Sequence, residues 1–563
     1  MTSSRAAFVM IGLLVASGAS AQEPGIIDRD PPPSPPAPAV APEPEPVPVP
    51  EPVPVPVPEP VPAPGPGVSG ISDKAPAAAP QAGSGVEFTV HGGWQWRFGH
   101  ESAFPLDETG YEDGLSDSLV QRLRLKPVAR FPARVRLVTS FDLLAGQVWG
   151  DELPATTPTG RPTGREVLIW PAESGAFTRA TLREAYVEWT SSAGRLTVGQ
   201  QASSWGLGMV ASDGEDRDGA FTDAVHGDLV DRVMFVTRPL EAFGLGDAFS
   251  KGLHLALAGD FVFRDDNADA LDGDRAFQGV AALFWQRGAT LAGVYAAYRH
   301  QTFDNGDLLR VTMLDASARH SFPLPSGLAL TAEAEGAILF GRTDAVALAR
   351  APDGMDVLSW GMVARAELDA SRIRLRPGIE LGVASGDPDP SDGTMRAFSF
   401  DPDHQVGMIL FQDVLARTTV SAAGRVADPA LLKDPPHGYD LSATNGSITN
   451  AVYLYPRVRY RPIPDLEIRA AFLWARALAP VTDPYNTALA GGYPRSHRGG
   501  AAGKGLGWEA DLGATWRIPV RDLLAFHVGV QGGVFRAGDA FADAAGDTLP
   551  TVWKVRALAD VTF

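Results

Sequence analysis

The chain of 563 residues contains no cysteine, so neither a disulfide framework nor a thiolate metal site is possible. It has no excess of positive charge either, because the formal net charge is −19, whereas nucleic-acid binding requires a basic surface. Beyond the N-terminus, no apolar run approaches the roughly 18 residues that a transmembrane helix needs. These absences exclude a disulfide scaffold, nucleic acid as a partner and a helical membrane anchor.

The N-terminus has the parts of a secretory signal. Arg5 supplies a positive charge, residues 6–16 (AAFVMIGLLVA) are apolar, and residues 19–21 (Ala-Ser-Ala) match the cleavage pattern. We therefore predict a signal peptide at 1–21. The mature protein then leaves the cytoplasm, and if it spans a membrane it must do so as a β-barrel.

Proline dominates the next part of the chain. Residues 31–66 alternate proline with alanine, glutamate and valine, which prevents both helical and sheet hydrogen bonding. We predict that 22–85 is a disordered, Pro-rich periplasmic spacer with an extended polyproline II core. Its roughly 36 proline-rich residues would reach on the order of 110 Å. The segment is either a passive linker or a spacer across the periplasm that docks on peptidoglycan or on an inner-membrane partner.

From Val86 to the C-terminus, apolar and polar residues alternate with the two-residue period of β-strands. In 86–98 the tryptophans Trp94 and Trp96 fall on the apolar face, and Arg97 falls on the polar face. A soluble core would bury the arginines or expose the tryptophans, whereas a membrane barrel satisfies both faces. The last segment ends in the aromatic Phe563, which resembles the terminal signature that the barrel assembly machinery of bacteria recognises.

Nineteen segments have this alternation, but single-chain bacterial barrels normally have an even number of strands. Short connections such as 131–134 and 191–194 all lie on one side, unless the segment 404–411 is counted as a strand. A large extracellular loop at about 385–449 restores the parity. We predict an all-β fold: one transmembrane antiparallel up-and-down barrel of about 18 strands over 86–563. Both termini are then periplasmic, in the outer membrane of a Gram-negative bacterium.

The inward-facing register collects many charged side chains. Arginines in a narrow wet lumen select anions, provided that carboxylates do not cancel them. We favour a partly cationic lumen, because 119–131, 371–376 and 456–461 hold few acidic residues within the same strand. The alternative is that the charges pair across strands. The predicted pore-lining and selectivity residues are Arg122, Arg124, Arg136, Arg183, Arg195, Arg365, Arg372, Arg374, Arg376, Arg457, Arg459, Arg461, Glu333 and Glu335.

Several loops are rich in aspartate, among them 213–219, 264–274 and 385–393. Carboxylates at this density are candidate Ca²⁺ ligands, and Asp387, Asp389 and Asp392 are the ones we single out. None of the loops has the spacing of an EF-hand, so solvated loops are the favoured interpretation. We predict no other metal, no cofactor and no catalytic residue, because no nucleophile-elbow, zinc-protease or phosphate-loop motif occurs.

Two stretches resemble the alginate-export family of outer-membrane channels. Residues 383–411 (VASGDPDPSDGTMRAFSFDPDHQVGMILF) are similar to its Ala-Ser-Gly-Asp strand end, acidic turn and following aromatic-Asp segment. Residues 182–209, together with 221–225, are similar to its Glu-Ala-Tyr strand and the element after it. Residues 199–201 read Gly-Gln-Gln where the family pattern suggests Gly-Arg-Gln, so a cation is missing. The resemblance implies an eighteen-stranded, arginine-lined transport channel, and does not extend to alginate as the substrate.

We therefore predict an outer-membrane channel, or porin, that passes anionic or polar solutes, with an exopolysaccharide as one candidate. The long loops, chiefly 385–449, would form its gate. Outer-membrane lipid, lipopolysaccharide, the assembly machinery and peptidoglycan are the expected partners. The rival hypothesis is a plugged structural barrel that anchors the envelope through its Pro-rich segment. A third is an outer-membrane hydrolase.

Overall fold

The computed structural model describes residues 85–112, 116–151, 180–217, 219–225, 227–346, 351–390, 392–433, 437–438, 441, 443–520 and 523–563. The predicted signal peptide at 1–21 and all but the last residue of the predicted spacer at 22–85 lie outside the described residues.

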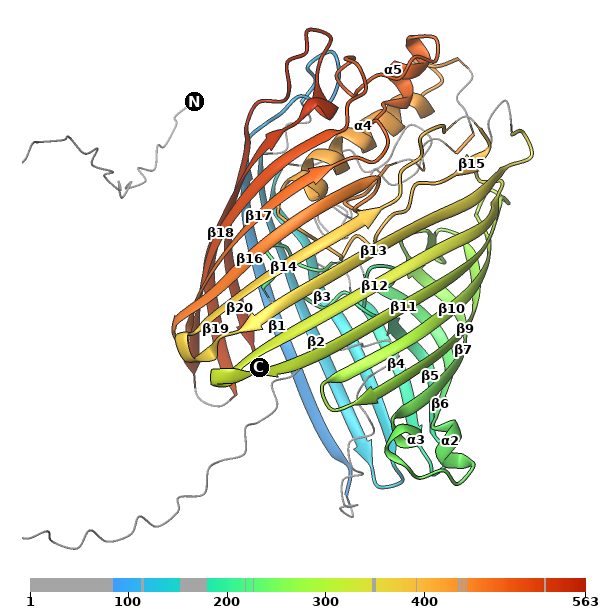
Figure 1. The fold of residues 1–563 in the computed structure, drawn as a ribbon, viewed down its shortest axis with the longest axis vertical. Helices are drawn as coiled ribbons and strands as arrows, with labels where there is room; N and C mark the ends of the chain where they lie inside the picture. Colours follow the sequence, from blue (N-terminus) through green and yellow to red (C-terminus); the bar gives the residue numbers. More distant parts are fainter. Residues whose placement is uncertain are drawn as a thin grey trace, which may run out of the picture. The chain divides into compact units, whose positions relative to one another are not determined.

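A single sheet of 20 strands makes up the described fold (Figure 1). Two of these strands, β8 (Ala268–Asp269) and β15 (Thr394–Met395), are two-residue pieces within connections, which leaves 20 − 2 = 18 strands in the wall. The wall strands are β1 (Glu87–Glu101), β2 (Asp117–Phe131), β3 (Val135–Gly150), β4 (Ala180–Thr190), β5 (Arg195–Ser203), β6 (Asp228–Thr237), β7 (Leu253–Asp265), β9 (Arg275–Arg287), β10 (Thr290–Thr302), β11 (Leu308–Leu324), β12 (Leu328–Thr343), β13 (Met355–Asp369), β14 (Leu375–Ala384), β16 (Ala451–Ile463), β17 (Leu466–Arg476), β18 (Gly505–Val520), β19 (Leu524–Ala537) and β20 (Val552–Thr562).

The sheet closes on itself, because β1 pairs antiparallel with β20 as well as with β2. In the closing register Trp96 lies opposite Ala559, and the backbone of Phe563 exchanges hydrogen bonds with Gly92. A closed barrel leaves no strand edge with unpaired backbone groups. The predicted all-β barrel and its strand number are confirmed.

Short connections gather at one rim of the barrel and the long ones at the other. The segment 404–411 is not a wall strand: it leads into a π-helix (Leu410–Leu415) and then α4 (Ala416–Ala427). No wall strand is described between β14 and β16, which agrees with the predicted parity, and the extracellular position of the 385–449 loop stays a prediction. The short-connection rim has one longer excursion, 238–252, which carries α2 (Pro239–Ala242) and α3 (Ala248–Gly252). The described residues also include α5 (Pro484–Leu489) and the 3₁₀ turns Pro325–Gly327, Ser371–Ile373 and Asp539–Phe541.

One predicted strand start is wrong. The wall strand placed at residue 371 begins at Leu375, because Arg372 lies in a 3₁₀ turn and Arg374 has a left-handed backbone with φ of 58°. Arg372 and Arg374 are therefore exposed at the short-connection rim rather than aligned on the inner wall. A period-two pattern that runs into a tight turn cannot reveal where the turn begins.

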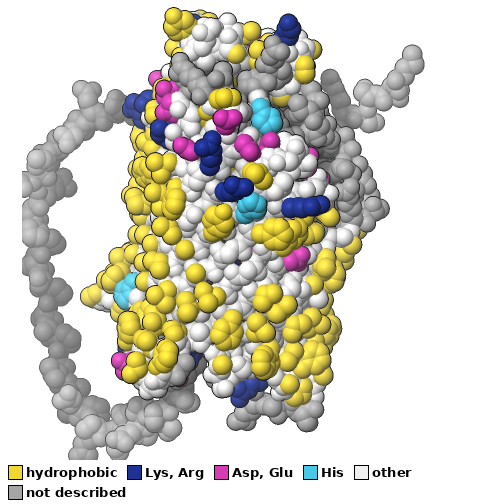
Figure 2. All heavy atoms as spheres, turned by 90° about the vertical axis from the view of Figure 1, so that its right-hand side faces the viewer, with side chains coloured by type: hydrophobic (Ala, Val, Ile, Leu, Met, Phe, Trp, Pro, Cys, Tyr) yellow, Lys and Arg dark blue, Asp and Glu magenta, His cyan; other side chains and the backbone are white. Residues whose placement is uncertain are grey.

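The two faces of the wall differ in chemistry as predicted. Large apolar side chains on alternate positions are exposed outwards, for example Leu257, Leu314 and Trp360. Figure 2 shows hydrophobic side chains covering much of one side of the wall, with most charged side chains near its upper end. Inward positions such as Arg232 and Asp260 are buried and joined in an ion pair of 2.7 Å. None of the helices among the described residues is long and apolar enough to cross a membrane.

Candidate functional site: a lumen occupied by two loops

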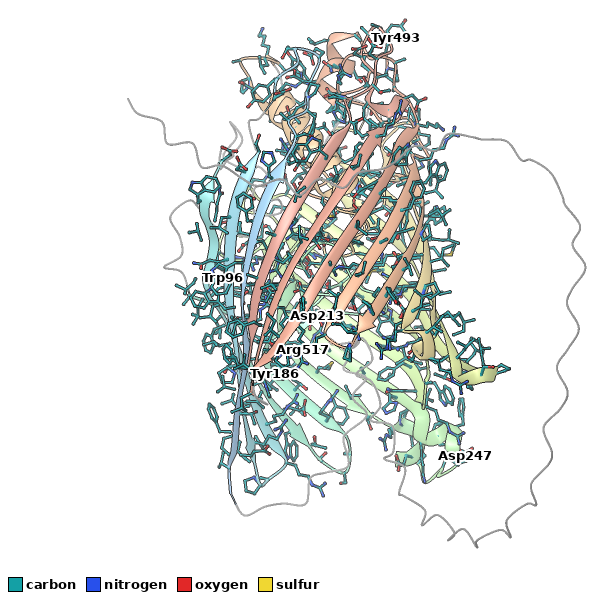
Figure 3. The ribbon with its side chains drawn as sticks, turned by 90° about the vertical axis from the view of Figure 1, so that its left-hand side faces the viewer. Trp96, Tyr186, Asp213, Asp247, Tyr493 and Arg517 are labelled. Carbon is teal, nitrogen blue, oxygen red and sulfur yellow. The ribbon has the colours of Figure 1, made fainter. Side chains whose placement is uncertain are left out.

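Two long connections fold into the barrel instead of projecting from it. The β5–β6 loop spans 204–227, and the β14–β16 loop spans 385–450. Figure 3 shows Asp213 of the β5–β6 loop at mid-height of the barrel, between the rim with Tyr493 and the rim with Asp247. Arg124 of the wall donates a hydrogen bond to the carbonyl of the neighbouring Gly214 at 3.2 Å, so this part of the loop contacts the inner face of the wall.

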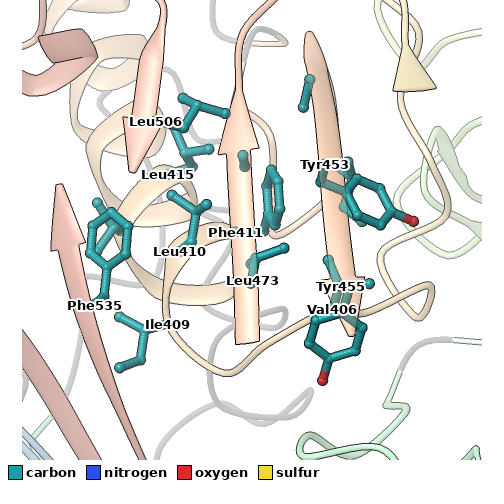
Figure 4. Close-up of a cluster of buried hydrophobic side chains, with 14 of the residues drawn as sticks. Val406, Ile409, Leu410, Phe411, Leu415, Tyr453, Tyr455, Leu473, Leu506 and Phe535 are labelled. Carbon is teal, nitrogen blue, oxygen red and sulfur yellow. The ribbon is translucent and has the colours of Figure 1, made fainter. Parts of the chain in front are cut away.

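An apolar cluster holds the β14–β16 loop against the wall (Figure 4). Ile409, Leu410 and Phe411 of the loop are fully buried against wall residues that include Leu473 and Phe535. These side chains come from inward positions of β17 and β19, where a water-filled pore would expose them. Burying them stabilises the inward course of the loop by roughly 1.5–3 kcal/mol for each large side chain.

Wall carboxylates bind the backbone of both loops. Glu509, which is 0 % exposed, accepts from the N–H groups of Met408, Ile409 (2.9 Å) and Leu410 (2.8 Å). Glu335 of β12 does the same for Leu207 and Met209 of the β5–β6 loop. Loop N–H groups inside the barrel would otherwise lack partners, and an unpaired buried donor is costly. In each loop, several backbone N–H groups are therefore bound by one wall carboxylate.

A buried chain of polar side chains links the two loops to each other and to the wall. Arg217 of the β5–β6 loop lies 3.1 Å from Nδ1 of His404 in the β14–β16 loop. His404 Nε2 lies 3.1 Å from Glu380 of β14, and Tyr453 of β16 donates to the same carboxylate at 2.8 Å. Burial, and then the positive charge of Arg217, lower the pKa of His404, so the ring is neutral at pH 7. A neutral ring can accept from Arg217 at Nδ1 while Nε2 donates to Glu380.

The acidic segment of the β5–β6 loop, residues 213–217 and 219–224, meets a group of wall arginines. Asp223 pairs with Arg97 of β1 at 2.7 Å and with Arg556 of β20. Although burial opposes ionisation, these two guanidinium groups hold the pKa of Asp223 below its usual range. Asp216 accepts from Gln95 at 2.9 Å and lies 4.0 Å from the guanidinium of Arg122.

Wall arginines also donate to backbone carbonyls of this segment. Arg122 donates to Ala224 at 3.0 Å, Arg183 to Asp213 at 3.1 Å and Arg556 to Phe221 at 3.0 Å. Arg469 of β17 donates to Ala220, and its guanidinium lies 5.3 Å from the ring of Phe221. The wall therefore binds the segment through both its charges and its carbonyl dipoles.

Most of the predicted lumen arginines are ion-paired within the wall, as the alternative interpretation held. Each pair joins side chains of two different strands, which is why counting acidic residues within single strands missed them. The pairs are Arg124–Asp142 (2.7 Å), Arg136–Glu188 (3.2 Å), Arg195–Glu188 (3.8 Å), Arg365–Glu333 (2.7 Å), Arg376–Asp369 (2.9 Å), Arg457–Glu367 (3.9 Å), Arg459–Glu367 (2.7 Å) and Arg461–Glu467 (2.8 Å).

The predicted Ca²⁺ ligands are used by neighbouring protein groups. Asp387 and Asp392 both face Arg396, the latter at 2.8 Å, and Asp387 accepts from the N–H of Asp389. These three aspartates do not form a ligand cluster; in the described part of the chain, one group of three carboxylates has oxygens within 4.8 Å of one another, and it consists of Asp228, Asp266 and Asp401. Burial, and then repulsion from Asp403, raise the pKa of Asp401 to about 8.

Comparison with known proteins gives similarity of fold alone. No protein-family model matches the chain, and no curated protein matches it in sequence. Among solved structures, OccK5 (OpdH) of Pseudomonas aeruginosa aligns with a TM-score of 0.44 and 10 % identity, covering 85 % of this chain and 98 % of that one. OpdK of the same organism, with vanillate, aligns with a TM-score of 0.45 and 14 % identity, covering 84 % and 98 %. TM-scores and identities this low add no argument about function, and they lend no support to the resemblance to alginate exporters.

Proposed function

We propose that the protein is an outer-membrane channel that passes polar or anionic solutes. The observation that carries this proposal is the division of side chains by the closed wall, apolar outside and ion-paired inside. Lipid outside and water inside satisfy both faces, and the closed sheet pairs its own backbone. The short-connection rim and both termini are then periplasmic, and the long loops face the exterior.

The partners follow from the same arrangement. Outer-membrane lipid and lipopolysaccharide contact the outward apolar band, and the assembly machinery recognises the terminal strand that ends at Phe563. The Pro-rich segment reaches peptidoglycan across the periplasm. The protein has no catalytic role in this proposal, so the purified chain should hydrolyse neither lipid nor peptide.

We further propose that the lumen prefers anions. The arginines that face the β5–β6 loop are the contacts for a passing anion, because their charge is directed at the space that the loop enters. An exopolysaccharide is one candidate solute. Passage requires both loops to move, since their apolar and polar contacts occupy the lumen.

The test is reversal potential across a planar bilayer under a salt gradient, with the full mature chain. We expect an anion-preferring conductance that R122Q/R124Q reduces. The matched control is R130Q, at an exposed arginine of the same strand that pairs with Glu87 at 3.3 Å. An unchanged reversal potential in R122Q/R124Q would remove these arginines from the proposal.

The inward loops also favour a second function, a plugged barrel that anchors the envelope. Their buried contacts with inward-facing wall residues favour a filled lumen, as a structural barrel would require. Deletion of residues 31–66 distinguishes the two functions. A channel keeps its conductance without the Pro-rich segment, whereas an anchor loses its envelope phenotype and conducts in neither form.

A further inference from the structure

We propose that the acidic segment occupies a binding site for multiply charged anions, formed by Arg97, Arg469 and Arg556 on the wall, and that such an anion opens the channel by displacing it. This inference rests on the proposed channel function and names how that channel is regulated. The occupant in the resting state is part of the chain itself, and its competitor is a solute that carries several carboxylates.

Two of the three arginines, Arg97 and Arg556, form ion pairs with the β5–β6 loop. Within the described residues, Arg556 is held by Asp223 and the carbonyl of Phe221, both from the loop. Arg97 pairs with Asp223 and with one wall carboxylate, Asp560. Withdrawal of the loop therefore removes the only loop carboxylate shared by these two guanidinium groups, while Asp560 stays behind.

Withdrawal of the acidic segment changes the net charge of the arginine site. Arg469 has the neutral partners Ala220, Phe221 and Gln531, so it retains no carboxylate of its own among the described contacts. Three guanidinium groups with one wall carboxylate leave an excess of about two positive charges. A lumen that is ion-paired at rest thus becomes cationic when the segment leaves.

The chemistry of the arginine site favours a ligand with several carboxylates. Guanidinium groups bind carboxylates through paired, charge-assisted hydrogen bonds, which are about twice as strong as neutral ones. The segment presents two carboxylates: Asp223 pairs with Arg97 and Arg556, and Asp216 lies beside this site, where it accepts from Gln95 and is 4.0 Å from Arg122. One turn holds both, because Asp216 accepts from the N–H of Ala224 at 2.9 Å. A solute with several carboxylates replaces both at once, whereas a monocarboxylate replaces one and leaves the other bound.

The carboxylates of the acidic segment differ in their exposure to the lumen. The side chains of Glu215 and Asp216 are 56 % and 39 % exposed, whereas that of Asp223 is 8 % exposed. Lumen water therefore reaches the outer part of the segment first. A competing anion can replace the exposed carboxylate before the buried one, so displacement proceeds in steps.

The test uses the isosteric double variant D216N/D223N of the full mature chain, with citrate as the multivalent probe and acetate as the monovalent one. We expect the variant to open more often, to prefer anions more strongly and to bind citrate at least about tenfold more tightly than the unmodified protein. Acetate affinity should change much less. Citrate binding is measured by calorimetry in detergent, independently of conductance. The matched control is D304N/D353N, which removes two exposed loop carboxylates.

The outcomes separate the inference from the function it rests on. Equal citrate affinity in the double variant and the control overturns the inference, even if both conduct. Tighter citrate binding without any current supports the site and refutes the channel. If D216N/D223N fails to form a barrel, as judged by its heat-dependent migration in gels, E215Q replaces it. That exposed side chain lies 3.4 Å from Arg124, so its loss should raise citrate affinity in the same direction by a smaller factor, and no change there overturns the inference.

Discussion

The fastening of the β14–β16 loop by Glu509 gives a quantitative prediction. In E509Q the three loop N–H groups lose a charged acceptor, and an amide oxygen can serve at most two of them. Hydrogen bonds to charged groups contribute about 1.5–3 kcal/mol each and neutral ones about 1 kcal/mol. Losing one bond and weakening two should cost about 3 kcal/mol, which shifts the opening equilibrium of the loop about a hundredfold.

Trypsin cleavage after Arg417 measures that opening. Arg417 lies on α4 of the same loop, is 4 % exposed and pairs with Glu101 at 3.1 Å. Trypsin therefore reaches it only when the loop dissociates from the wall. When opening is fast relative to cleavage, the rate follows the open population. We expect cleavage about a hundred times faster in E509Q and unchanged in E87Q, an exposed rim control. A rate within about threefold of the unmodified protein, with the barrel intact, would refute the reasoning.

The same cleavage assay checks three further predictions. Burial raises the pKa of Asp213 to about 6, and burial followed by repulsion from Asp403 raises that of Asp401 to about 8. Arg217 also lies near Asp401, and Asp228 and Asp266 have carboxylate oxygens within 4.8 Å of it. Because both pKa values are raised, the seated loops are most stable below about pH 3.8 and lose stability as pH rises through about 6 and 8. Cleavage should accelerate over that range, and D401N should flatten its upper part. Y453F loses the hydrogen bond to Glu380 and should raise cleavage about fivefold, or about 1 kcal/mol. G219A places a Cβ 2.7 Å from Cδ of Arg459 at a φ of +81°, and should cost about 1–2 kcal/mol, whereas G424A, with open space around it in α4, should not accelerate cleavage.

The barrel wall was predictable from sequence because a two-residue period has one structural meaning over eighteen segments. The requirement for an even number of strands then excluded 404–411 from the wall, although its local sequence resembles that of a strand. The predicted strand start at 371 was wrong because the alternation of Arg372, Arg374 and Arg376 begins within the turn that precedes the strand. The sequence gives no indication that Arg374 adopts a left-handed backbone conformation there.

The occupied lumen was not predictable in the same way. The segments 213–219 and 385–393 read as solvated acidic loops, yet the first of them meets Arg124 of the wall, which lies 90 residues away in the chain. Long-range partners of this kind leave no periodic trace. One signal was present: the apolar run 406–411 in a loop that should be exposed indicates burial, and inside a barrel the only place for it is the lumen.

The most direct test of this account is single-channel recording of the full mature chain beside E509Q. We predict rare openings of the unmodified protein, frequent openings of E509Q, and an anion-preferring reversal potential in both. Absence of current from E509Q under conditions where trypsin cleaves after Arg417 would contradict the account, because the loop would then be released from a barrel that still does not conduct.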